Sequence, residues 1–275
     1  MARPGSRSRH AREACSFRRR HRAGRGRALY SGPVGDLPFP IAGDEVAERL
    51  LRVLDVEGKI PRALDALGPL GGCDVVLLDA APRCRTAQLV ALGARLTVVD
   101  RDAAGGPAGS GAPVPEGMCV IAGTPAATGL PDASSDAVVA LWTALAAPAT
   151  AELAEADRIL RPGGRLLVLQ DYGRDDLDPV RGPERTDQLV SWSRRDGWYL
   201  CHGFRIHVVH AFWTFESIEA AASLLRDAFG PAGEGVGARL HRPRLAHNVV
   251  VYHRTQGEMS RPRAARAPAA TRDLA

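Results

Sequence analysis

The chain has 275 residues, of which 45% are hydrophobic and 24% are charged. This mix is typical of a globular protein with one large domain or two small ones, and it excludes collagen-like and wholly disordered chains. The sequence has no apolar run of about 18 residues, and its Arg-rich N-terminus lacks the apolar stretch of a secretory signal. We therefore expect a cytoplasmic protein without a membrane span.

The net charge of +5 is unevenly distributed along the chain. Residues 1–27 hold ten arginines against Glu13, and residues 254–275 hold five arginines against two acids, which leaves residues 28–253 at −7. Because an acidic body repels phosphate backbones, we expect nucleic-acid binding only through the Arg-rich tail. The predicted organisation is a disordered tail over 1–27, a folded domain over 28–254 and a disordered tail over 255–275.

The cysteines and histidines do not form a recognisable metal or disulfide framework. The cysteines are odd in number, scattered and without a C-x-x-C pair, which predicts unpaired thiols. They are Cys15, Cys73, Cys84, Cys119 and Cys201. His207 and His210 are separated by an odd number of positions in a predicted strand, so they point to opposite faces. We predict no metal site.

Apolar runs and turn signals predict an alternation of helices and strands. Asp44 is the expected N-cap of a helix over 45–54, and Pro61 opens a helix over 61–67 that Gly68 closes. A buried strand over 74–78, a helix over 86–92 and a strand over 95–99 form a βαβ unit, whose chirality makes the two strands parallel neighbours.

The alternation continues through most of the chain. It predicts strands over 118–121 and 137–142, a helix over 150–160 and a strand over 165–170. Continuous apolar strands between helices indicate a parallel sheet that is covered on both faces. In the last third we expect a strand over 204–215, an amphipathic helix over 217–229 opened by Glu216 and closed by Gly230, and a strand over 248–252.

Three segments have distinctive sequences. Residues 130–139 spell LPDASSDAVV before a strand, residues 159–168 spell ILRPGGRLLV at a helix-to-strand turn, and residues 93–100 spell GARLTVVD. In the second, Pro162 and two glycines permit the chain to stop a helix and reverse within four residues. All three resemble segments of class I S-adenosylmethionine-dependent methyltransferases, in particular of the group called methyltransferase type 11.

This resemblance implies an α/β fold: a Rossmann-like, doubly wound, mostly parallel sheet of about seven strands with an antiparallel final strand. It also implies S-adenosyl-L-methionine as the cofactor. In the family, the acid that ends the second strand accepts hydrogen bonds from the cofactor ribose. Asp100 matches that acid, and it follows Asp79 by about the 20 residues that ribose recognition in nucleotide-binding βαβ units requires.

The chain departs from the family pattern in the loop after the first strand. The family places a G-x-G-x-G loop there, whereas residues 79–86 spell DAAPRCRT and contain no glycine. Side chains at Ala81 and Arg83 would occupy space that the cofactor normally takes, and Pro82 lacks an N–H donor. The family commonly has an acid after the third strand that contacts the adenine. At that position this chain has Thr124, which follows Gly123.

The expected site residues follow from these matches. The predicted cofactor-binding residues are Asp79, Ala81, Arg83, Asp100, Arg101, Gly123, Thr124 and Trp142. Asp171 and Tyr172 end the fifth strand, and ligands of open α/β sheets bind at the carboxyl ends of strands. Either residue suits the role of catalytic base near a methyl acceptor.

The leading hypothesis is methyl transfer from S-adenosylmethionine to an unidentified, small acceptor. The alternative is a non-catalytic methyltransferase-fold protein that binds or scaffolds and has lost its cofactor, and the glycine-free loop favours it. A nicotinamide-dependent enzyme is a weaker third hypothesis, because no G-x-G-x-x-G fingerprint is present. The aromatic residues between 190 and 215 would either line an acceptor pocket or pack the core of that segment.

Overall fold

A computed structural model describes residues 37–39, 41, 43–78, 84–101 and 117–257. The predicted tail over 1–27, nearly all of the tail over 255–275 and the glycine-free loop over 79–83 lie outside these residues. The described strands are β1 Asp74–Leu78, β2 Arg95–Asp100, β3 Met118–Ala122, β4 Ser135–Ala140, β5 Leu160–Asp171, β6 Arg205–Thr214 and β7 Arg244–Thr255. The described helices are α2 Asp44–Val53, α3 Lys59–Leu67, α4 Cys84–Ala91, α5 Thr150–Ile159, α6 Asp178–Arg181, α7 Pro183–Trp192, α8 Trp198–Cys201 and α9 Ile218–Gly237.

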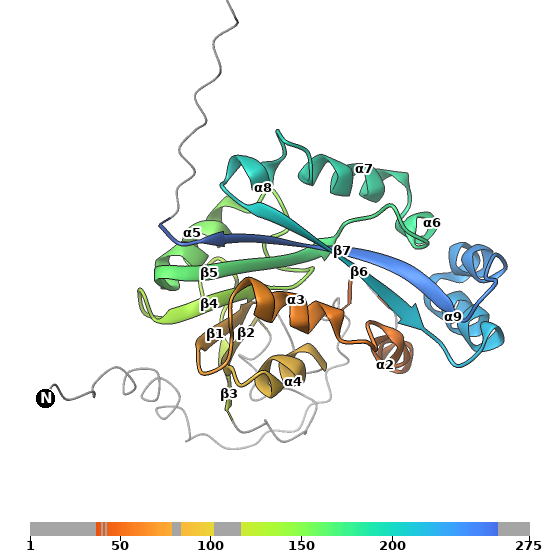
Figure 1. The fold of residues 1–275 in the computed structure, drawn as a ribbon, viewed down its shortest axis with the longest axis horizontal. Helices are drawn as coiled ribbons and strands as arrows, with labels where there is room; N and C mark the ends of the chain where they lie inside the picture. The colour runs from red at the N-terminus through yellow and green to blue at the C-terminus, as the bar shows by residue number, and fades with distance from the viewer. Residues whose placement is uncertain (1–36, 40, 42, 79–83, 102–116, 258–275) are drawn as a thin grey trace, which may run out of the picture.

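The strands form one seven-stranded sheet in the order β3-β2-β1-β4-β5-β7-β6 (Figure 1). Strand β1 pairs in parallel with β2 and β4, β2 pairs in parallel with β3, and β4 pairs in parallel with β5. Strand β7 runs antiparallel between β5 and β6. The predicted fold class is therefore confirmed: a doubly wound, mostly parallel sheet with an antiparallel final strand.

Helices cover both faces of the sheet, and each face has its own apolar core. Along β1, Val75 and Leu77 belong to one core cluster, and Val76 and Leu78 belong to the other, as the two-residue period of a strand requires. Helices α2, α3, α4 and α9 pack on the first face, and α5, α7 and α8 pack on the second (Figure 1). Burial on both faces explains why the strands are continuously apolar.

The LPDASSDAVV segment is a turn clamped to the end of α5. The amides of Ala133 and Ser134 donate to the carbonyls of Arg158 and Ile159, each at 2.9 Å. The Arg158 guanidinium reaches Asp132 at 2.5 Å. Ala133 has a positive φ of 47°. This segment therefore fixes the turn against α5 directly before β4 begins.

The ILRPGGRLLV segment joins α5 directly to β5. Gly163 has a φ of 80°, which favours glycine, and a Cβ on Gly164 would lie 2.9 Å from the Arg161 carbonyl oxygen. Arg161 also bridges Asp74 at the start of β1 and Asp136 of β4, at 3.0 and 2.6 Å. Both glycines are needed by the backbone itself, as the sequence predicted.

Several helix boundaries differ from the expected ones. Helix α2 begins at Asp44, and its N-cap is Gly43. Helix α3 begins two residues before Pro61, because the Asp55 carboxylate accepts hydrogen bonds from the amides of Lys59 and Ile60 at 2.9 and 2.8 Å. These local polar contacts override the apolar periodicity that set the predicted boundaries.

The largest differences lie in the last third of the chain. The N-cap of α9 is Ser217, whose hydroxyl accepts from the Ala220 amide at 3.1 Å, rather than Glu216. The helix kinks at Gly230 and continues to Gly237 instead of ending at Gly230. Helices α6, α7 and α8 were not predicted.

The cysteines differ in bonding state. Cys73 and Cys201 are free thiols, as expected, whereas Cys119 is disulfide-bonded. The prediction of unpaired thiols was therefore wrong at Cys119, since distance along the sequence does not show which strand and loop ends meet in space.

No helix among the described residues is long and apolar enough to cross a membrane. The same residues contain no group of three or more histidine, cysteine, aspartate or glutamate side chains placed to hold a metal ion.

Glu155 of α5 gives the fold a pH-dependent contribution to stability. Hydrogen bonds donated by Arg158 and by Thr128 outweigh burial and lower the pKa of Glu155 from 4.5 to about 2. A carboxylate with a lowered folded-state pKa stabilises the fold fully above its unfolded pKa, and this contribution is lost as the pH falls through the folded pKa.

We therefore predict that Glu155→Gln lowers the free energy of unfolding at neutral pH. The deficit relative to the wild type should shrink as the pH falls from 4.5 towards 2, because the wild-type carboxylate then protonates. Urea denaturation across this range measures the difference, with the exposed Glu184→Gln as the control. A deficit that stays constant with pH would contradict the role of the Glu155 charge.

Candidate functional site

The carboxyl ends of the parallel strands meet at one edge of the sheet, where open α/β sheets bind ligands. Leu78 at the end of β1 lies beside Val99 of β2 and Ala140 of β4. The carboxyl ends of β1, β2, β3, β4 and β5 therefore lie side by side here. Three predicted cofactor residues, Asp79, Ala81 and Arg83, belong to this edge by sequence but lie outside the described residues.

Asp100 ends β2 and is only 5% exposed. Its carbonyl accepts a hydrogen bond from the Gly123 amide at 3.2 Å, so the acid at the end of β2 and the loop after β3 are neighbours. Arg101 follows at the surface. A Cβ on Gly123 would lie 2.9 Å from the Thr128 carbonyl oxygen, so the packing of this turn alone requires glycine there.

Thr124 lies at the base of a tight turn. Its amide and carbonyl exchange hydrogen bonds with those of Ala127 at 3.1 and 3.0 Å, and Pro125 is buried within the turn. The side chain of Thr124 is exposed. The turn therefore presents a hydroxyl next to the segment that contains Asp100.

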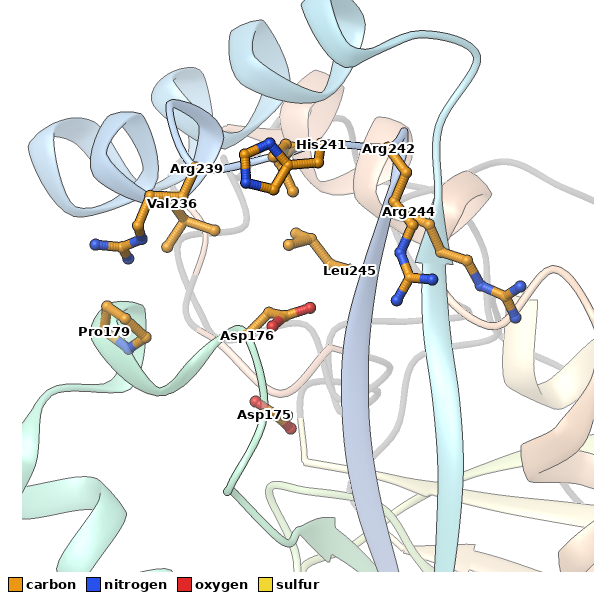
Figure 2. A pocket seen from close by; sticks show the side chains of 10 residues that line it. Asp175, Asp176, Pro179, Val236, Arg239, His241, Arg242, Arg244 and Leu245 are labelled. Carbon is orange, nitrogen blue, oxygen red and sulfur yellow. The ribbon is translucent and has the colours of Figure 1, made fainter.

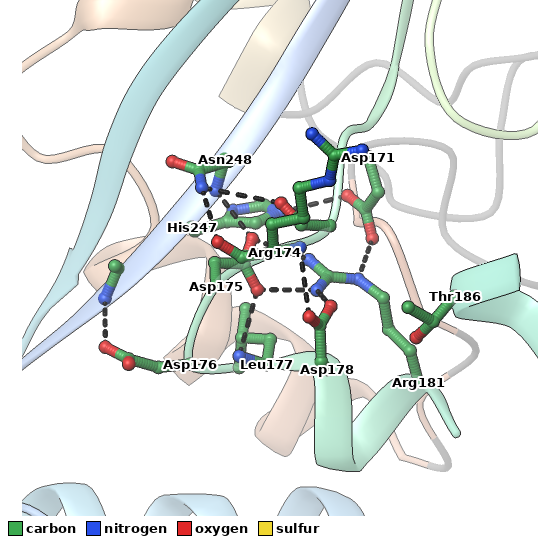
Figure 3. Close-up of polar contacts among 12 residues, drawn as sticks. Asp171, Arg174, Asp175, Asp176, Leu177, Asp178, Arg181, Thr186, His247 and Asn248 are labelled. Carbon is green, nitrogen blue, oxygen red and sulfur yellow. Dashed lines mark hydrogen bonds and ion pairs between the residues drawn. The ribbon is translucent and has the colours of Figure 1, made fainter. Parts of the chain in front are cut away.

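A buried polar network lies at the ends of β4 and β5 (Figure 3). Asp171, the last residue of β5, is 3% exposed. Its Oδ1 accepts from the Trp142 indole and from His247, each at 3.0 Å, and its Oδ2 accepts from Arg181 Nε at 2.7 Å. Both oxygens of the carboxylate are thus occupied by protein donors. Trp142, predicted to contact the cofactor, is itself 5% exposed and engaged in this network.

Arg181 of α6 connects Asp171 to the loop that follows β5. Its side chain is 1% exposed and reaches Asp175 at 2.5 Å and Asp178 at 2.9 Å. Asp175 accepts in addition from the Asn248 amide of β7 at 2.7 Å. The guanidinium fork therefore joins β5, α6 and β7 at this edge, as Figure 3 shows.

His247 is a fully buried residue that the sequence analysis did not identify. Its Nδ1 lies 3.1 Å from the Trp213 indole nitrogen. Because an indole N–H can only donate, Nδ1 accepts, and the imidazole is neutral with its proton on Nε2, directed at Asp171. The two-residue period of β7 could have indicated that His247 is buried, because it places His247 on the same inward face as Leu245 and Val249.

The charge of Asp171 is stabilised by these partners. Burial alone would raise the pKa of this carboxyl group, but the hydrogen bond from His247 and the Arg181 guanidinium hold the pKa below its ordinary value. Asp171 is therefore a carboxylate at neutral pH, with no accepting oxygen left unused.

Tyr172 follows Asp171 and is half-buried. Its amide donates to the Asn248 carbonyl at 2.9 Å, and the Arg174 guanidinium lies 5.6 Å from the centre of its ring. Of the two predicted catalytic residues, Tyr172 is the one whose side chain is not enclosed by the network.

The aromatic cluster of residues 190–215 serves mainly as packing. Trp192, Tyr199 and Phe204 belong to the core on one face of the sheet, and Trp213 belongs to the core on the other. Trp192 also lines a cavity of about 340 Å³ together with Trp198. A larger cavity of about 620 Å³ lies between α6, the end of α9 and the start of β7.

Comparisons with known proteins match this chain in structure. No protein-family model matches the sequence. No curated protein matches it either.

Solved structures do match. A protein classified as a type II methyltransferase from Anaeromyxobacter dehalogenans has a TM-score of 0.50 at 18% identity, over 71% of this chain and 94% of that one. A protein classified as a methyltransferase of an antibiotic biosynthesis pathway from Anabaena variabilis has a TM-score of 0.48 at 16% identity, over 74% and 99%. At sequence identities this low, the similarity concerns the fold alone, and it rests on the structure from Anaeromyxobacter dehalogenans. The chain has the fold of class I S-adenosylmethionine-dependent methyltransferases.

The described residues suit the ribose and adenine portions of such a cofactor. A carboxylate at the end of β2 is the acceptor that ribose hydroxyls require, and the Gly123–Thr124 segment lies directly beside it. The residues expected next to the methionine portion belong to 79–83.

We predict that Asp171→Asn lowers the free energy of unfolding by about 2–3 kcal/mol, because it leaves Arg181 with one buried partner fewer. Chemical denaturation at neutral pH measures this loss. Asp187 is exposed on α7, so Asp187→Asn should change the free energy of unfolding by no more than about 0.5 kcal/mol. Equal effects of the two substitutions would contradict the structural importance of the network.

Proposed function

We propose that this protein transfers a methyl group from S-adenosylmethionine to a small acceptor. The observation that carries the proposal is the buried Asp100 at the carboxyl end of β2, within a sheet of class I strand order. A carboxylate in that position is the feature by which nucleotide-binding βαβ units recognise a ribose.

In this proposal residues at the ends of β1, β2 and β3 would hold the cofactor. Asp100 accepts hydrogen bonds from the ribose hydroxyls, Arg101 flanks the same edge, and Gly123 and Thr124 border the adenine. Asp79, Ala81 and Arg83 would take the methionine side. Trp142 closes the site from the end of β4.

The bound cofactor supplies an electrophilic methyl group on a sulfonium. The protein's own contribution is to hold the acceptor in line with that methyl and to accept a proton where the acceptor loses one. We assign the acceptor side to Tyr172. Asp171 acts as a positioning residue, because Trp142, His247 and Arg181 already occupy its oxygens.

Calorimetric titration with S-adenosylmethionine and S-adenosylhomocysteine tests the cofactor site. We expect both to bind the wild type and the control variant Asp187→Asn with the same affinity. Asp100→Asn removes the charge of the ribose acceptor, so its affinity should fall about tenfold or more, the equivalent of losing a charged hydrogen bond.

A wild-type protein that binds neither compound at millimolar concentration would contradict the proposal. The chain would then be a methyltransferase-fold binding or scaffolding protein that has lost its cofactor. Equal binding by the wild type and Asp100→Asn would instead place the cofactor elsewhere on the sheet edge.

A further inference from the structure

The cavity of about 620 Å³ is an open groove at the other end of the same sheet edge (Figure 2). Its walls are the loop into α6, the end of α9 with the residues after it, and the start of β7. This volume falls within the range of about 300–1,000 Å³ that small-molecule sites occupy. None of the predicted cofactor residues lines it.

The floor of the groove is apolar. Val236 of α9 is 3% exposed and Leu245 of β7 is 1% exposed, and both side chains line the groove. A ligand that covers them gains from the burial of its own apolar atoms. The floor therefore suits an aliphatic segment between polar ends.

Unpaired positive charge flanks the groove on two sides (Figure 2). Arg239 and Arg242 are exposed and form no ion pair within the part of the chain that the structure describes. Arg244 is different, because it pairs with Glu57 and lies 3.6 Å from the centre of the Phe212 ring. Two guanidinium groups thus keep donors available for a carboxylate or another anion.

Between these two arginines, the groove carries unpaired negative charge. The Asp176 carboxylate points into the groove in Figure 2, and its Oδ2 accepts from the Ala246 amide at 2.7 Å. No cationic side chain among the described residues pairs with it. The side chain of the neighbouring Asp175 is fully buried and bonded to Arg181, so it offers a ligand no free oxygen.

These charges discriminate between ligand classes. A simple anion would meet the repulsion of Asp176, and a simple cation would meet that of Arg239 and Arg242. A molecule with both charges satisfies both kinds of residue. We propose that the groove binds a small aliphatic zwitterion, whose ammonium group contacts Asp176 and whose carboxylate is attracted by the flanking Arg239 and Arg242. This proposal is independent of the methyl-transfer reaction.

Calorimetry at low ionic strength, without cofactor, tests the proposal with glycine, 4-aminobutanoate and 6-aminohexanoate as probes of increasing charge separation. Hexanoate and 1-aminohexane, each with one charge, are the matched controls. We expect at least one of the longer zwitterions to bind, and to bind about tenfold more tightly than either singly charged compound.

The variants separate the contributions of the positive and the negative residues. Arg242→Gln and Arg239→Gln should each weaken binding of the zwitterion, and Asp176→Asn should weaken it while keeping the hydrogen bond to Ala246. Arg226→Gln, an exposed substitution on α9 away from the groove, should leave it unchanged. Failure of all three zwitterions to bind, or hexanoate binding as tightly as the zwitterions, would overturn the proposal.

Discussion

The buried carboxylate of Asp171 is the contact on which the arrangement of the sheet edge depends. A charge removed from water must be compensated by hydrogen bonds and by an opposite charge. Here the compensation comes from three separate segments: Trp142 after β4, Arg181 of α6 and His247 of β7. Because each donor occupies its own lone pair, the ends of β4 and β5, the start of β7 and the short helix α6 are held in one relative position.

Two kinds of surface follow from that constraint. Towards β1 and β2, the edge presents Asp100 beside the Gly123–Thr124 turn, where we propose that the cofactor binds. Towards β7, the second end of the Arg181 fork fixes Asp175, and the loop that carries Asp176 and Tyr172 is fixed with it. Asp176 in the groove and Tyr172, which we propose lies nearest the acceptor, are therefore positioned by the same buried ion pair. The two proposed sites lie on opposite sides of Asp171.

Much of the fold could be predicted from the sequence because its signals are local. Continuous apolar strands and the turns around Ala133 and Gly163 depend on neighbours close in the chain, and the structure confirms them. The cap at Ser217 was missed because a single polar contact decides it, and Gly43 was missed because it caps α2 without a side-chain hydrogen bond. His247 was missed as a site residue because its partners, Trp213 and Asp171, are distant in sequence, and only pairing of β7 with β5 and β6 brings them together.

The central claim is that the cofactor binds at the ends of β2 and β3. Hydrogen exchange of the backbone amides, with and without saturating S-adenosylhomocysteine, tests it most directly. The account predicts slower exchange at Asp100–Arg101 and Gly123–Thr124, and unchanged exchange over 239–245 in the groove. Protection confined to the groove, or no protection at either place, would contradict it.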